Sequence, residues 1–139
     1  MQVRKNEYGY IVRFEAGEEM IALLKKFCKE NDFRAAAFTA IGATTKIELG
    51  FYELSSKRYH WKEFSGEYEV TGGVGNISIF ENDIVIHMHT SIADITYRAY
   101  GGHVRSLVVG ATLEVVLTRF GDAIERKSDE KIGLNLWSI

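Results

Sequence analysis

The sequence contains no proline and a single cysteine, Cys28, among its 139 residues. One cysteine excludes a disulfide framework within the chain and also a cysteine-rich zinc module. Basic residues are not in excess, since 17 Lys and Arg stand against 19 Asp and Glu and give a net charge of −2. A free-standing nucleic-acid-binding domain usually carries a basic surface. This composition does not provide one.

Long apolar runs are also missing, because none approaches the ~20 residues that span a bilayer, and no apolar signal region follows the start at Met1. The phosphate-binding loop Gly-x-x-x-x-Gly-Lys-Ser/Thr is absent, as is a Gly-x-Gly-x-x-Gly fingerprint after a strand. These absences predict a cytoplasmic protein without a membrane partner or a nucleotide-binding motif.

The composition that remains is ordinary for a globular protein, with 46% hydrophobic and 26% charged residues. The length fits one domain of typical size. No linker, low-complexity tract or internal repeat interrupts the chain, so residues 1–139 are predicted to form a single domain.

Hydrophobic periodicity predicts one long helix and many strands. After Gly17, apolar residues at three-and-four spacing form one buried stripe, which ends before Asn31 and Asp32 and makes Cys28 a core thiol rather than a nucleophile. Strand patterns occupy residues 8–14, 34–41, 47–54, 57–64, 67–70, 83–90, 104–120 and 132–137. This distribution predicts an α+β fold with a large, mostly antiparallel β-sheet and one main helix.

The strand predicted at 104–120 has apolar residues on both faces. Its odd positions from Leu107 to Leu117 are all apolar, and its even positions include Val108 and Val116. One helix cannot cover both faces of a sheet, so this pattern favours a subunit interface. The alternative is that the domain folds its own sheet over both faces.

Three of the four histidines are candidate metal ligands. His87 and His89 are two residues apart on one strand, so their side chains share a face. His103 follows Gly101 and Gly102, and this pair of glycines allows a turn that brings its imidazole close to the other two. The alternative reading is polar residues that face solvent or an interface. His60 lies in an aromatic strand and is predicted to be a surface or packing residue.

Three imidazoles would leave one tetrahedral position open on a divalent transition metal, with zinc as the first choice among several suitable ions. Glu114 is a candidate catalytic residue, because a carboxylate in an apolar strand is costly unless it is paired. It would orient a metal-bound imidazole, accept a proton at the metal, or pair with an Arg across an interface.

At several of these positions the sequence resembles the PPC domain, the plant and prokaryote conserved domain. The resemblance covers nearly the whole chain and rests on the order and spacing of five motifs. These are Gly66-Glu67-Tyr68-Glu69-Val70, Gly75-Asn76-Ile77-Ser78, His87-Met88-His89-Thr90-Ser91, Gly101-Gly102-His103-Val104 and Thr112-Leu113-Glu114-Val115-Val116-Leu117.

The resemblance implies a PPC-like α+β fold, a homotrimeric assembly, and metal binding by His87, His89 and His103. In plant members an AT-hook grips DNA, but this sequence has no such segment. Three functions are therefore carried forward. The first is a homotrimeric metal-binding assembly or regulatory module, and the second is a metal-dependent hydrolase or hydratase. The third is a protein that binds DNA or a DNA-binding partner.

Overall fold

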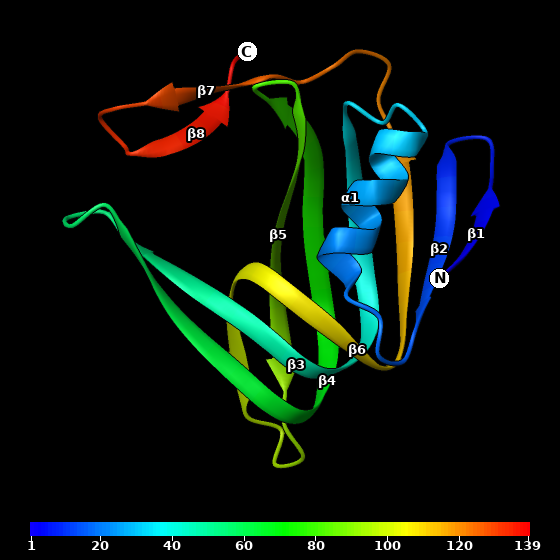
Figure 1. Cartoon of the computed structure of the whole chain (residues 1–139). Helices are drawn as coiled ribbons and strands as arrows, with labels where there is room; N and C mark the ends of the chain where they lie inside the picture. The colour runs from blue at the N-terminus through cyan, green and yellow to red at the C-terminus, as the bar shows by residue number, and fades with distance from the viewer.

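The computed structural model describes residues 1–139 and combines a six-stranded sheet, one helix and a separate two-stranded hairpin (Figure 1). The elements in chain order are β1 (Gln2–Lys5), β2 (Gly9–Glu15), α1 (Met20–Glu30), β3 (Ala36–Glu53), β4 (Arg58–Phe80), β5 (Asp83–Ala93), β6 (Ala99–Arg119), β7 (Arg126–Asp129) and β8 (Leu134–Trp137). Every strand pairing is antiparallel, which confirms the predicted α+β fold. The helix is not long and apolar enough to cross a membrane.

The strands are longer than the sequence pattern predicts. Segments 34–41 and 47–54 join into β3, and segments 57–64 and 67–70 join with the residues up to Phe80 into β4. The glycines between them do not end strands. Instead, the pairing register shifts at Gly42 and again between Val70 and Gly72, so these positions are β-bulges that let one strand bend and continue. The short strands β1 and β7 were not predicted.

The sheet closes on itself along part of its length. Its strand order is β1-β2-β6-β3-β4-β5, and β5 also pairs with the first residues of β6. Strands β6, β3, β4 and β5 therefore form a closed circle, while β1 and β2 extend the sheet beyond it. The long strands bend as they pass from one part to the other, as Figure 1 shows for β3 and β6.

The helix packs against this sheet over a single apolar core. Met20, Leu24, Phe27 and Cys28 are buried, which confirms the predicted stripe. Burial raises the pKa of the Cys28 thiol to about 12, so this group is a core side chain rather than a nucleophile. The helix begins at Met20, where the carboxylate of Glu19 accepts hydrogen bonds from two backbone N–H groups of the first turn.

Strand β6 has one covered face and one open face. Leu107, Leu113 and Leu117 are fully or almost fully buried, whereas Val116 is 52% exposed. We call the face turned away from the core the outer face. Within one chain the even positions 106–112 are partly covered and 114–118 are exposed, because the only helix lies on the other side of the sheet (Figure 1). The alternative that the domain covers both faces itself is therefore met only in part.

Candidate metal centre

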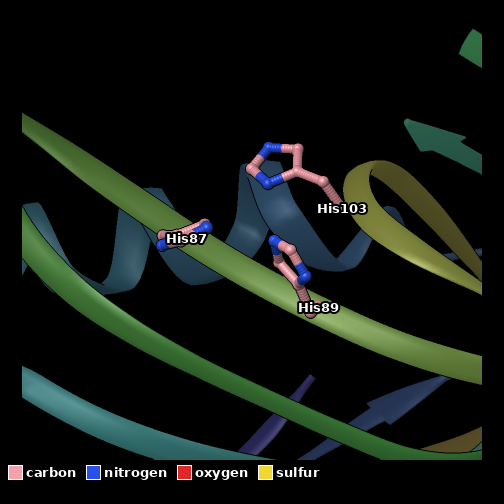
Figure 2. A group of neighbouring side chains, drawn as sticks. All are labelled: His87, His89 and His103. Carbon is pink, nitrogen blue, oxygen red and sulfur yellow. The ribbon is translucent and has the colours of Figure 1, made fainter. Parts of the chain in front are cut away.

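The three histidines come together at the junction of β5 and β6. His87 and His89 are two residues apart on β5 and lie on the outer face, while Met88 between them is fully buried in the core. His103 of β6 lies directly opposite His89 in the strand register. Figure 2 shows the three rings turned toward one another. One ligand atom from each ring lies within 4.8 Å of the others.

Glycine makes this junction possible, although not through the turn that the sequence predicts. Gly101 and Gly102 lie within β6, which here pairs with β5 on one side and β3 on the other. A Cβ atom at Gly102 would lie 2.8 Å from the carbonyl oxygen of Gly50. A larger residue would therefore push β6 away from β3 and move His103 from its position opposite His89.

Aromatic rings from β4 form a wall beside His103. The Tyr59 ring stacks on Trp61 and lies 5.2 Å from the His103 ring, measured between centroids. Gly50 makes room for this wall, because a Cβ there would lie 2.5 Å from the Trp61 ring. The aromatic strand at 57–64 was predicted, but its place beside the histidines was not, since Tyr59 and Trp61 are more than forty residues from His103 in the chain.

Burial keeps two of the imidazoles neutral. It lowers the pKa of His87 and of His103 to about 4, and the positive charge of Arg126 acts in the same direction on both. A metal ligand must offer an unprotonated nitrogen. Both side chains are therefore in the metal-binding form throughout the neutral pH range.

Arg126, at the start of β7, lies beside the histidines and was not identified from the sequence. Its guanidinium donates hydrogen bonds to Ser78 Oγ at 2.6 Å and Asn76 Oδ1 at 3.0 Å on β4, and to the backbone oxygen of Asn135 at 2.7 Å. Its Nη2 atom is 3.5 Å from His87 Nδ1. These contacts attach the β7–β8 hairpin to the outer face next to the histidines.

The other candidate residues lie elsewhere. Glu114 is exposed on β6, opposite Arg13 of β2 and Ile41 of β3, and is not one of the residues whose ligand atoms cluster. The Glu114 side chain points away from the core, so its carboxylate is not buried and the predicted cost of burial does not apply. His60 is exposed, with its Nε2 atom 3.3 Å from a carboxylate oxygen of Glu53, as expected for a surface residue.

The residues present fit a divalent transition metal. Three imidazole nitrogens are a donor set that such ions accept. The Nδ1 atom of His103 is buried without a hydrogen-bond partner, which is costly for a polar atom and is relieved by a ligand. Nitrogens on one zinc ion lie roughly 3.4 Å apart at bond lengths of about 2.0–2.1 Å. The observed limit of 4.8 Å therefore requires only modest ring rotations.

Known proteins resemble this chain in sequence and in fold. The model of the Plants and Prokaryotes Conserved (PCC) domain matches residues 1–121. A "putative DNA binding protein" from Bacteroides thetaiotaomicron VPI-5482 superposes with a TM-score of 0.95 at 28% identity, covering 99% of this chain and 96% of that chain. The comparison with curated proteins found no match.

Two further solved structures are similar over all or nearly all of their length. A plant- and prokaryote-conserved (PPC) protein from Pyrococcus horikoshii has a TM-score of 0.88 at 28% identity, covering 99% of this chain and 95% of that chain. The metal-containing protein AF0104 from Archaeoglobus fulgidus has a TM-score of 0.87 at 32% identity, with complete coverage of both chains.

Proposed function

The chain belongs to the Plants and Prokaryotes Conserved (PCC) domain family, and from this premise we propose that it is a metal-binding assembly or regulatory module. His87, His89 and His103 hold a divalent transition metal, with zinc as the first choice. Three copies of the chain associate as a homotrimer. When bound, the metal supplies a Lewis-acidic centre with a coordination position that the protein leaves open.

The observation that carries this proposal is the meeting of three imidazoles at one strand junction. Their ligand atoms lie within 4.8 Å of one another, two are neutral because of burial, and one has a buried nitrogen without a partner. The similarity to a protein named as metal-containing supports the same reading. Histidines that merely faced solvent would not need this combination.

Self-association is supported by a row of mostly apolar side chains across the outer face. The strand registers align Ile11, Val116, Thr39 and Val74 on neighbouring strands, and the row continues to His89. Val74 is 65% exposed and Val116 is 52% exposed. Contiguous exposed apolar surface of this kind is typical of protein–protein interfaces. The proposed interface therefore adjoins the metal site.

Metal analysis of the untagged protein tests the metal site. After incubation with Zn²⁺ and removal of excess ion, we expect about one zinc per chain in the wild type, as a single three-His site provides. His89→Ala and His103→Ala should each lose most of this zinc at micromolar concentrations. His60→Ala is the matched control and should retain it. Equal zinc content in all four proteins, or none in the wild type, contradicts the proposal.

DNA binding is a second candidate, favoured by the name of the Bacteroides neighbour. The net charge of −2 weighs against it, because binding through phosphates relies on Lys and Arg. If the chain binds DNA, an AT-rich duplex should be retarded at low salt, and the apparent affinity should fall steeply as salt rises. Failure to retard the duplex at low salt removes this candidate.

A further inference from the structure

We propose that the metal centre is the receptor for a small oxyanion, a carboxylate or a phosphate, which one oxygen joins to the metal and another joins to the guanidinium of Arg126. This inference rests on the proposed metal site. It adds a ligand class and a fourth functional residue, which comes from a hairpin outside the residues 1–121 that the family model matches.

The guanidinium of Arg126 is held in a fixed position beside the histidines. Its hydrogen bonds to Ser78 and Asn76 come from β4, and Asn76 is paired directly with His87 in the strand register. The bond to the Asn135 backbone comes from β8. Three bonds from two separate parts of the fold hold the guanidinium in one orientation, with Nη2 near His87. The group is therefore preorganised rather than a mobile surface charge.

Arg126 has no counterion within the chain. None of the ion pairs of the chain includes Arg126. The guanidinium is nevertheless half-buried. A partly buried charge is costly unless an opposite charge pairs with it. Because imidazole ligands carry no negative charge, a divalent ion would raise the local charge further, and an anion would compensate for both.

The guanidinium of Arg126 still has N–H groups free to bind a ligand. A guanidinium carries five N–H groups in a planar fork. The bonds to Ser78, Asn76 and Asn135 use three of them, and the contact from Nη2 to His87 Nδ1 lies at the 3.5 Å limit of a hydrogen bond. One N–H on Nη1 and the weakly held one on Nη2 remain for a ligand. Carboxylates and phosphates match this fork best among anions.

The surroundings also suit such a ligand. Tyr59 and Trp61 stack beside His103 and offer an aromatic wall for the organic part of a carboxylate or phosphate ester. The metal and the guanidinium would bind the oxyanion, and the aromatic wall beside His103 would contact its organic part.

Cobalt provides the test, because Co²⁺ bound to the full chain absorbs visible light in a way that depends on its ligands. The Co²⁺-loaded wild type is titrated with sodium acetate and, separately, with inorganic phosphate at constant ionic strength. Saturable spectral change with either anion is expected. In Arg126→Gln the dissociation constant for that anion should rise by roughly 10- to 100-fold, as loss of a charge-assisted hydrogen bond predicts, while the cobalt content stays at wild-type level.

Two further variants are measured in the same titrations. Lys127→Gln removes a positive charge from the next residue of the same hairpin, whose side chain is exposed, and should leave anion binding unchanged. Arg126→Lys keeps the charge without the fork and should weaken binding less than Arg126→Gln. It also tests the proposal if Arg126→Gln does not fold.

The outcomes separate the two proposals. Wild-type protein that binds cobalt but gives no response to either anion, or an equal response in the wild type and both Arg126 variants, overturns the oxyanion receptor and leaves the metal site intact. Wild-type protein that binds no cobalt overturns the metal site, and the receptor with it. A response to acetate alone or to phosphate alone identifies the kind of oxyanion.

Discussion

Each histidine of the cluster has a different environment. His89 is exposed on the outer face, His87 is half-buried beside Arg126, and His103 is half-buried against Tyr59 with one nitrogen unpartnered. Burial favours the uncharged imidazole. At His103 a bound metal would also provide a partner for a buried polar atom that otherwise has none.

The lowered pKa values of His87 and His103 predict how stability depends on pH in the metal-free protein. The ordinary pKa is 6.5 and the folded-state pKa of both is about 4. As the pH falls below 6.5, the unfolded chain takes up protons that the folded chain refuses, so stability decreases between about pH 6.5 and pH 4. Urea unfolding at several pH values measures this loss.

The control for this experiment is His103→Asn, which removes one of the two titrating groups. Carboxylates also titrate in this range, so the comparison between the two proteins is the informative quantity. The variant should show a pH dependence shallower by up to about one proton per molecule. An identical pH dependence in both proteins would mean that His103 titrates normally in the folded chain.

At the scale of single residues, the sequence predicted the three histidines of the cluster but not the residues that contact them. Residues two apart on a strand must share a face, so the His87 and His89 pair could be recognised from spacing alone. Arg126 has no such local pattern. It reaches the histidines only because the β7–β8 hairpin folds back onto β4, and side-chain contacts over 39 residues leave no periodic trace in the sequence.

At the scale of elements, the junction of β5 and β6 determines the site. Gly102→Ala tests it, because the added Cβ would meet the Gly50 carbonyl oxygen at 2.8 Å. We expect a loss of stability on the order of 1–3 kcal/mol from overpacking, and weaker zinc binding as His103 is displaced. Urea unfolding and zinc titration measure the two effects.

Gly72→Ala is the matched control for Gly102→Ala. It also lies within a strand, β4, but a Cβ there would meet nothing within 4 Å. Its stability and zinc affinity should stay near wild-type values. If the two variants behaved alike, close approach of β6 to β3 would not be what makes glycine necessary at position 102.

The start of α1 depends on Glu19. Its carboxylate accepts hydrogen bonds from Ile21 and Ala22 of the helix and, at 2.9 Å, from the backbone N–H of Leu107 in β6. Glu19→Ala should therefore cost about 1–2 kcal/mol, at the upper end for a helix cap. Glu30→Ala at the other end of the helix is the control, since its only ion pair is a 3.9 Å contact with Lys26. Equal losses in urea unfolding would contradict this role.

The elements themselves were predictable in type but not in extent. The helix and the strand pattern followed from periodicity, because one face of each is buried. The joining of β3 across Gly42 could not be predicted. A glycine between two apolar segments is compatible with both a turn and a bulge, and only the long-range pairing partner decides between them. In β4, by contrast, the apolar residues move from even positions before Gly72 to odd positions after Gly75, and this change predicts the β-bulge or bend that the register shift confirms.

At the scale of the whole molecule, the open outer face predicts association between copies. Val116→Lys places a charge in the row that includes Val74 and Ile11, and should convert the proposed trimer to smaller species. Light scattering after size-exclusion chromatography measures the mass. Leu136→Lys on β8, a position that is 38% exposed, is the control and should remain trimeric. A monomeric wild type, or a trimeric Val116→Lys variant, contradicts the proposed interface.

The central claim is that His87, His89 and His103 share one metal ion, and anomalous scattering at the zinc edge tests it most directly. In a crystal of the zinc-loaded protein, we predict one strong anomalous peak per chain at bonding distance, about 2.0–2.1 Å, from one nitrogen of each imidazole. A crystal that contains zinc by fluorescence but has no peak among these three rings would contradict the account.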